Sequence, residues 1–381
     1  MRIGILGGTF NPIHTAHVQM ARIARDEASL DRVLLMVAAD PPHKRVEGEV
    51  PAEIRLELAR LAAQNETRVE PSDLELRRGG KSYTLDTLLE LQKQYPGAEL
   101  FLVLGSDTLG DLPNWHKPEE VLKIASVLCV PRIGLCENDA ETAKELTARY
   151  GAKIRLLSGK ADRISSTEVR DRLEEGLDTT GLLPDAVEQA CYESGEYFPP
   201  EIQKMQQKLR AALSQKRYRH VCGTMRAAAC LSQVWKQDPK KARVASLLHD
   251  CAKCLDPVTQ EVLSGDDSGV YPVYHAFAGA VLARTEYGIA DDSILRAIRL
   301  HTTGEDGMSD FDALVYAADL IEPTRTFLSV EEYRRRVNDG VDAFMRYSLQ
   351  RVSRLIAQRG WAVHPASARA LAYYERKAGL K

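Results

Sequence analysis

The pattern of apolar residues in this chain changes near its middle. Over residues 1–130, short apolar runs of strand type alternate with segments whose apolar residues recur at helical spacing, and a last strand-like run follows near residue 154. Such alternation favours a parallel α/β sheet with helices on both faces. After about residue 195 only helical spacing remains. The sequence therefore predicts an α/β domain with a parallel sheet over residues 1–195 and an all-α domain over residues 196–381.

Local signals define the expected elements. Strands are expected at 2–8, 32–39, 100–106, 126–132 and 153–158, and helices at about 17–28 and 51–64. Ser165, Ser166 and Thr167 can cap a helix that ends at Gly176. Gly195 and Pro199–Pro200 mark the junction between the two predicted domains.

The composition narrows the class of protein. A chain of 381 residues is long enough for two or three domains, each with its own core. Its net charge of -3 gives no global basic surface, so nucleic acid is not an expected partner. The apolar run at the N-terminus is too short for a secretion signal or a membrane span, which favours a cytoplasmic protein with no membrane partner. The composition is compatible with a homo-oligomer and does not determine the oligomeric state.

The cysteines indicate no disulfide framework. Seven of them are scattered along the chain, which favours reduced thiols. Cys251 and Cys254 form a single CxxC pair, and we interpret them as two small helix residues rather than as a redox or zinc motif.

Eight of the nine histidines fall into two sets of four. The first third of the chain holds His14, His17, His43 and His116, the second half holds His220, His249, His275 and His301, and His364 stands apart. The first set lies around a glycine-rich turn, whereas Asp250 and Asp319 accompany the second. The two sets therefore indicate two catalytic units with different chemistry.

The glycine-rich turn has the features of a phosphate site. Gly7, Gly8, Thr9 and Phe10 follow the first strand and open the first helix, where free backbone N–H groups and the helix dipole favour an anion. His14 and His17 lie three residues apart, on one face of the first turn, and can donate to phosphate oxygens. The alternative is a Rossmann-type strand-to-helix turn whose histidines only cap the helix or pack. Further phosphate-ready residues, His43 and Lys44 and the Ser165–Thr167 run with Arg170, favour the functional interpretation.

Several stretches of the first half together carry a family resemblance. They are GGTFNPIH, DPPHK, the run from Ser82 to Leu88, Gly105-Ser106-Asp107, Trp115-His116 and ISSTEVR. The first half resembles the nucleotidyltransferase superfamily with its HxGH and SSTxxR motifs, and more closely the bacterial nicotinate-nucleotide adenylyltransferases. The resemblance implies a Rossmann-like fold and transfer of AMP from ATP, with Mg²⁺, to nicotinate mononucleotide.

The resemblance also implies residue roles. The ATP phosphates would be held by Thr9, His14, His17, Lys44, Ser166 and Arg170, with His17 acting on the charge of the transition state. The nicotinate nucleotide would be held by Thr84, Asp107, Trp115 and Arg132, with the Trp115 ring available for stacking. Gly7, Gly8, Phe10, Gly105 and Ser165 complete the expected nucleotide-binding set.

Two points qualify this resemblance. The glycine of the HxGH motif is Ala16 here, whose methyl group could hinder close approach of the nucleotide, although we expect activity to be retained. Adenylyl transfer to pantetheine phosphate is a second reaction of the same superfamily. The run from Ser82 to Leu88 and Trp115 argue against it.

The residues around the second histidine set favour a metal site. His220, His249, Asp250, His275, His301 and Asp319 all lie within helical segments or at their ends. Successive helices of a bundle can bring such side chains together. Four imidazoles and two carboxylates suit Fe, Mn or Zn better than Mg alone.

The second half resembles the HD phosphohydrolase superfamily. The run ASLLHDCAK carries this resemblance, and Tyr218–Val221, His301–Gly304 and Ala318–Pro323 resemble the bacterial symmetrical diadenosine tetraphosphatases. The family implies hydrolysis of diadenosine tetraphosphate to two ADP by two divalent metals, with iron first among the candidates.

The resemblance implies one set of ligands for each of the two metals, with Asp250 shared between the sets. One would be held by His220, His249, Asp250 and Asp319, and the other by His275, His301 and the bridging Asp250. Lys253 and Arg325 are candidates for contacting substrate phosphates. A phosphohydrolase for another nucleotide and a nucleotide-binding module without turnover are the alternatives.

Overall fold

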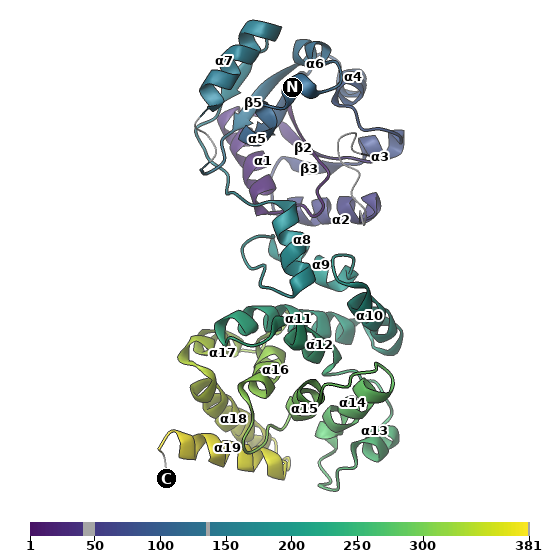
Figure 1. The fold of residues 1–381 in the computed structure, drawn as a ribbon, viewed down its shortest axis with the longest axis vertical. Coiled ribbons are helices and arrows are strands. Elements are labelled where there is room, and N and C mark those ends of the chain that lie inside the picture. The colour runs from purple at the N-terminus through teal and green to yellow at the C-terminus, as the bar shows by residue number, and fades with distance from the viewer. Residues whose placement is uncertain (41–49, 135–137, 380–381) are drawn as a thin grey trace. The chain divides into compact units, whose positions relative to one another are not determined.

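The computed structural model describes residues 1–40, 50–134 and 138–379, and the chain divides into two units (Figure 1). The first unit consists of Met1–Arg170 with Gly181–Ala190. The second consists of Asp171–Thr180 with Cys191–Lys381.

A six-stranded parallel sheet forms the centre of the first unit. Its strands, in the order β3-β2-β1-β4-β5-β6, are β1 (Arg2–Gly8), β2 (Arg32–Val37), β3 (Val69–Ser72), β4 (Glu99–Gly105), β5 (Ala125–Val130) and β6 (Ile154–Leu156). Its helices are α1 (Thr15–Glu27), α2 (Ala52–Ala63), α3 (Leu74–Arg78), α4 (Thr84–Gln94), α5 (Ser106–Leu109), η1 (Leu112–Asn114), α6 (Pro118–Ile124) and α7 (Asp139–Tyr150). The chain then forms α8 (Ser166–Glu175) and α9 (Asp185–Ser194). The predicted parallel α/β fold is confirmed.

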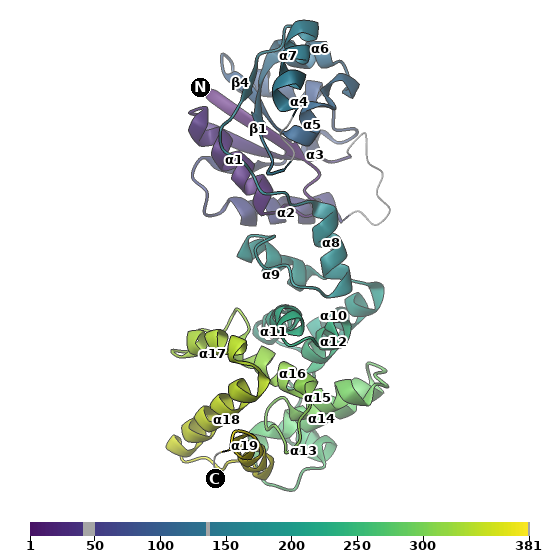
Figure 2. The ribbon, with the colours of Figure 1, turned by 60° about the vertical axis from the view of Figure 1, so that its left-hand side comes forward.

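Both faces of the sheet are covered (Figure 2). Ile3 and Ile5 of β1 pack with Leu88 of α4 in one hydrophobic cluster. Gly4 lies between them in the strand, so a side chain at this position would point to the opposite face of the sheet. A Cβ atom there would come within 2.7 Å of the Leu30 side chain. Near-continuous apolar strands are what a parallel sheet buried on both faces requires.

One strand and one helix start differ from the sequence prediction. The pattern of apolar residues predicts no strand at β3, since its residues Val-Glu-Pro-Ser include only one strongly apolar side chain. This strand pairs only with β2 and forms the sheet edge, where Pro71 is tolerated. Helix α1 begins at Thr15, two residues before the predicted start, because His14 rather than a later residue is its N-cap.

The second unit is helical, as predicted, and no strand occurs among its described residues. Its helices after α9 are α10 (Pro200–Ala212), α11 (Gln215–Val234), α12 (Pro239–Leu248), α13 (Pro257–Ser264), η2 (Tyr271–Val273), α14 (Tyr274–Thr285), α15 (Asp292–Leu300), α16 (Asp310–Ile321), α17 (Val330–Arg336), η3 (Val337–Asp339), α18 (Val341–Gln358) and α19 (Pro365–Lys377). Gly195 lies in the connection between α9 and α10. The interpretation of Cys251 and Cys254 as helix residues is wrong, because α12 ends at Leu248 and both cysteines lie in the turns that follow.

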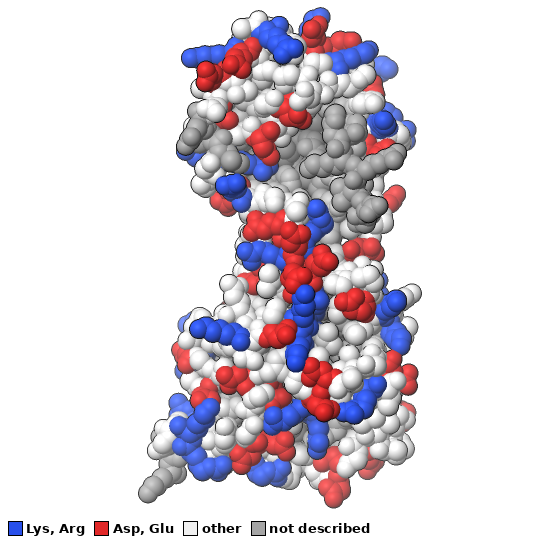
Figure 3. All heavy atoms as spheres, in the orientation of Figure 1, with Lys and Arg blue, Asp and Glu red and all other residues white. Residues whose placement is uncertain are grey.

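Charged residues of both signs are interspersed over the face of each unit that Figure 3 shows. His364, which the sequence left unassigned, caps α19 by accepting a hydrogen bond from the backbone of Ala366. Its other ring nitrogen lies 3.3 Å from Asp266. Within the described residues, no helix combines the length and the apolar character needed to cross a membrane.

Candidate active site and metal centre

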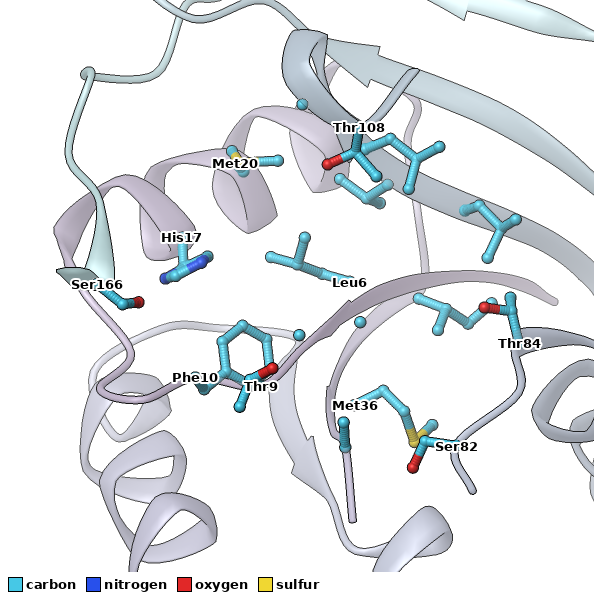
Figure 4. A pocket seen from close by; sticks show the side chains of 18 of the residues that line it. Leu6, Thr9, Phe10, His17, Met20, Met36, Ser82, Thr84, Thr108 and Ser166 are labelled. Carbon is cyan, nitrogen blue, oxygen red and sulfur yellow. The ribbon is translucent and has the colours of Figure 1, made fainter. Parts of the chain in front are cut away.

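A cavity of about 550 Å³ opens in the first unit at the carboxyl ends of β1 and β4. This edge is where parallel α/β sheets bind ligands. Figure 4 shows Thr9, Phe10, His17, Thr84 and Ser166 around this space. Nearly all predicted residues of the first set line it together: Gly7, Gly8, Thr9, Phe10, His14, His17, Thr84, Gly105, Asp107, Trp115, Arg132, Ser165, Ser166 and Arg170. Lys44, like His43, lies outside the described residues.

The turn after β1 is held by a residue that sequence reasoning missed. Arg55 of α2 is 1% exposed, and its guanidinium donates to the carbonyl oxygens of Thr9 (2.6 Å) and Ala38 (2.8 Å). These two carbonyls follow β1 and β2. A buried guanidinium that satisfies several carbonyls fixes their positions. Arg55 therefore ties the glycine-rich turn to the neighbouring strand.

His14 and His17 form one hydrogen-bonded and stacked pair. The backbone N–H of His14 donates to Nδ1 of His17 over 3.2 Å, and the two ring centroids lie 3.6 Å apart. Because Nδ1 of His17 accepts, the proton of the neutral ring lies on Nε2. Figure 4 shows this ring facing the cavity near Ser166. His17 can thus present an N–H donor to a phosphate.

Both imidazoles are kept neutral. Burial, with the nearby Arg132, lowers the pKa of His14 to about 3. Burial, with His14 and Arg132 adding repulsion, holds the pKa of His17 well below its usual value. Near pH 7 the pair therefore acts through hydrogen bonds rather than through positive charge.

Two contacts attach the start of α8 to the turn. Ser166 Oγ donates to the carbonyl oxygen of Pro12 (2.9 Å), and Arg170 donates to that of Asn11 (2.6 Å). Ser165 Oγ accepts from the backbone N–H of Glu168 and caps the helix, as predicted. The serine run and the glycine-rich turn, far apart in sequence, thus border the same cavity.

An ion pair lies at the end of β4. Arg132 NH1 is 3.5 Å from Asp107 Oδ2. A Cβ atom at Gly105 would come within 2.7 Å of Asp107 and 3.1 Å of Arg132. Gly105 is therefore needed so that both side chains can lie over the strand end.

Trp115 and Ala16 have different positions. Trp115 lines the cavity and also packs against the hydrophobic core. Ala16 is fully buried in α1 and is not among the described lining residues. The methyl group at the position of the motif's glycine is therefore buried and does not line the cavity in this structure.

The second unit brings the six predicted metal ligands together. His220 belongs to α11, His249 and Asp250 follow α12, His275 belongs to α14, His301 follows α15 and Asp319 belongs to α16. They form three overlapping groups, each with ligand atoms within 4.8 Å of one another: His220, His249 and Asp250; His249, His301 and Asp319; and Asp250, His275 and His301.

Asp250 lies between two pairs of imidazoles. Its Oδ2 is 3.6 Å from Nε2 of both His220 and His249. Its Oδ1 is 3.3 Å from Nε2 of His275 and 3.7 Å from Nε2 of His301. The two carboxylate oxygens thus face different histidine pairs, as a bridging ligand does.

Three of the histidines are oriented by partners behind them. Nδ1 lies 3.0 Å from Glu322 Oε1 in His220, 2.7 Å from the Ser246 carbonyl oxygen in His249 and 2.7 Å from the Ile298 carbonyl oxygen in His301. In the neutral ring Nδ1 carries the proton to these acceptors, which leaves the Nε2 lone pair for a metal. The donor set therefore fits a divalent-metal centre. The orienting role of Glu322 was missed, since the sequence places it only within a motif.

The charges within this cluster are strongly coupled. Burial, opposed by Asp250, lowers the pKa of His249 to about 4. Burial opposes the charge of Asp250, yet His249, His301 and His275 hold the pKa of that carboxyl well below its usual value. Burial likewise lowers the pKa of His275. Burial opposes the charge of His220, yet hydrogen bonds to Asp319 and Glu322 raise the pKa of that imidazole. Because neutral imidazoles and ionised carboxylates are the forms that bind metal, a metal held by His220 would displace a proton there.

Three cations contact the ligands. Arg325 pairs with Asp319, Lys253 Nζ is 3.1 Å from His275 Nδ1, and Arg217 NH1 is 2.5 Å from Asp250 Oδ2. Lys253, a candidate phosphate contact from the sequence, lies in the turns that follow α12. Arg217 was not singled out from the sequence.

Known families match each half of the chain. Residues 5–172 match the cytidylyltransferase-like family, and residues 217–324 match the HD domain family. The first half is similar to the probable nicotinate-nucleotide adenylyltransferase of Geobacter metallireducens, with 41% identity over 202 residues that cover 49% of this chain and 94% of the relative. The corresponding protein of Gloeobacter violaceus is 41% identical over 200 residues, which cover 52% of this chain and 97% of the relative.

A solved structure is similar to part of the chain. It is a predicted HD superfamily hydrolase involved in NAD metabolism from Clostridium acetobutylicum, with 30% sequence identity and a TM-score of 0.44. The similarity covers 46% of this chain and 97% of that chain.

Proposed function

Since the first half of this chain belongs to the nicotinate-nucleotide adenylyltransferase family, we propose that it transfers the adenylyl group of ATP to nicotinate mononucleotide. The products are nicotinate adenine dinucleotide and pyrophosphate. In this proposal the 5′-phosphate of the mononucleotide attacks the α-phosphorus of ATP, and pyrophosphate leaves with Mg²⁺.

The neutral His14–His17 pair at the start of α1 carries this proposal. His17 donates from Nε2 to the oxygens on which charge develops, and such a preorganised donor stabilises the transition state more than the ground state. Ser166, which lies near His17, and Arg170 bind the ATP phosphates from α8. Thr84, Asp107, Trp115 and Arg132 receive the nicotinate nucleotide.

The test uses the full chain with ATP, Mg²⁺ and either nicotinate mononucleotide or pantetheine phosphate. We expect pyrophosphate and dinucleotide to form in equal amounts with the nicotinate substrate alone. Product formation only with pantetheine phosphate would contradict the assignment.

For the HD domain we propose metal-dependent hydrolysis of diadenosine tetraphosphate to two ADP. The donor set around Asp250 supports it, with His220, His249, Asp250 and Asp319 holding one divalent ion, and His275, His301 and Asp250 holding another. Bound divalent metal supplies an activated water and neutralises phosphate charge. Iron is the first candidate, and Mn and Zn suit the same ligands.

Two results decide this assignment. The protein is stripped with EDTA, reloaded with Fe²⁺, Mn²⁺ or Zn²⁺, and given diadenosine tetraphosphate or a panel of other nucleotides. We expect ADP as the product and no hydrolysis by Asp250→Ala. Stoichiometric metal without hydrolysis would favour a nucleotide-binding module, and turnover only of other nucleotides would identify a different phosphohydrolase.

A further inference from the structure

Arg217 approaches the metal-ligand cluster of the second unit from one turn before His220 on α11. Residues three apart on a helix share a face. We propose that Arg217 is a phosphate-contacting residue that pairs with Asp250 in the metal-free protein and contacts phosphoryl oxygens of the substrate once metal is bound. This inference rests on the proposed hydrolase function.

The carboxylate oxygen that Arg217 contacts is one that a metal needs. Asp250 Oδ2 lies 2.5 Å from Arg217 NH1 and 3.6 Å from Nε2 of both His220 and His249. A divalent ion held by those two nitrogens would use the same oxygen. Because a guanidinium and a divalent ion repel each other at such short range, metal binding displaces Arg217 from Asp250.

The displaced guanidinium then needs another anion. The Asp250 side chain is 3% exposed, whereas that of Arg217 is 30% exposed, so Arg217 reaches the cluster from the solvent side. Arginine keeps its charge and matches the geometry of phosphate oxygens. A phosphate that enters from solvent and binds beside the metal supplies that anion.

Arg217 also bears on the class of substrate. The Arg325 side chain, 34% exposed, also pairs with a carboxylate of the cluster, that of Asp319, and its Nε donates in addition to the backbone carbonyl oxygen of Asp319. When a metal ion takes the place of either arginine at its carboxylate, the guanidinium keeps its positive charge but loses its partner. Two released arginines on different carboxylates suit a chain of several phosphates better than a single phosphomonoester.

A structural role makes the opposite prediction for metal affinity. If Arg217 only held α11 in place, its removal would displace His220 on the same helix and weaken metal binding. If it competes with metal for Asp250, its removal strengthens metal binding, because a competing cation is lost. The sign of the change therefore separates the two roles.

The experiment compares Arg217→Met with Arg219→Met in the full-length protein. Arg219 lies on the same helix, is 56% exposed and pairs with Glu193 at 3.0 Å, outside the cluster. In Mn²⁺ titrations of the stripped proteins, we expect the Kd to fall about fivefold in Arg217→Met, as loss of one partly exposed ion pair allows. Arg219→Met should bind Mn²⁺ like the wild type.

The second measurement is binding of inorganic phosphate, taken as the difference between Mn²⁺-loaded and metal-free protein to remove the contribution of the first unit. We expect Arg217→Met to weaken this binding about tenfold, and Arg217→Lys, which keeps the charge but not the planar fork, to weaken it less. Unchanged or weaker Mn²⁺ binding, or unchanged phosphate binding, in Arg217→Met would overturn the proposal. Arg217→Gln, which also removes the charge, takes the place of Arg217→Met in both measurements if Arg217→Met does not fold.

The two proposals fail separately. A wild-type protein that does not cleave diadenosine tetraphosphate contradicts the proposed substrate, yet both binding measurements still decide the role of Arg217. Where cleavage occurs, Arg217→Met should raise the KM for diadenosine tetraphosphate, whereas Arg219→Met should leave it unchanged.

Discussion

The backbone N–H of His14 donates a hydrogen bond to Nδ1 of His17, with 3.2 Å between the two nitrogens. This bond makes the start of α1 responsible for the tautomer of His17 and leaves Nε2–H as the only donor of the neutral ring. The same local contact thus lies at the start of a helix and sets the donor that His17 presents in the cavity.

Replacing His17 by Ala should lower the kcat of adenylyl transfer by roughly 100- to 1,000-fold, with a smaller change in the KM for ATP. The physical reason is loss of a donor aimed at developing charge. Pyrophosphate release gives the rate, and the metal content of the HD domain serves as an internal control for the preparation. An equal loss in His17→Ala and in His116→Ala, whose ring packs on Tyr83, would contradict a special role for His17.

Adenylyl transfer should show no imidazole ionisation between about pH 6 and 8, because the pKa values of His14 and His17 are both lowered by burial. A pH profile of kcat measures this. A fall in rate with an apparent pKa near 6.5 that disappears in a His17 variant would refute it.

The same lowered pKa values predict how stability depends on pH. Unfolding returns each imidazole to a pKa near 6.5, so below that pH the unfolded chain binds more protons than the folded unit. The contribution to stability is therefore full above pH 6.5 and is lost as the pH falls toward 3. Thermal unfolding of His14→Asn should show a shallower loss over the acid side than the wild type. Parallel curves would show that His14 titrates normally.

Arg55→Met should lower the free energy of unfolding of the first unit by about 3 kcal/mol, because the carbonyls of Thr9 and Ala38 would lose a buried donor. Denaturant unfolding, followed separately for the two units, measures this. Arg60→Met is the matched control, since Arg60 lies on the same helix at the surface and pairs only with Glu57 within the described residues. Similar unfolding of both variants would show that the Arg55 contacts contribute little.

Glu322→Gln should raise the Kd for metal about 10- to 100-fold, because the acceptor that orients His220 loses its charge. Metal titration of the stripped protein gives the value. Glu331→Gln changes an exposed carboxylate that pairs with Arg334 and should have no effect. Wild-type affinity in Glu322→Gln would mean that the carbonyl-anchored His249 and His301 suffice.

Much of the fold could be predicted because it follows from local patterns. Apolar runs separated by helical spacing identified five of the six strands, and the loss of that alternation identified the helical second unit. β3 was not predicted because an edge strand that contains Glu70 and Pro71 has no run of apolar residues. β3 pairs with β2 only because α2, which connects the two strands, returns the chain to the edge of the sheet.

The residues of the two candidate sites likewise include some that the sequence predicts and some that it does not. The clustering of His220, Asp250 and the other candidate ligands could be predicted because few residue types bind metal and they recur in a helical setting. Arg55, Arg217 and Glu322 could not, because an arginine or glutamate within a helical pattern is most often a solvated charge. Only the folded structure shows which carbonyl, carboxylate or imidazole each one meets.

The uncharged state of His14 and His17 also bears on turnover. A pair of imidazolium rings would attract the pyrophosphate product at long range and slow its departure. Neutral rings hold it only by short directional bonds, which break once the product moves away. We therefore expect the long-range attraction for pyrophosphate to come from Arg132 and Arg170, which line the same cavity, and the two histidines to contribute only while the product is within hydrogen-bond distance.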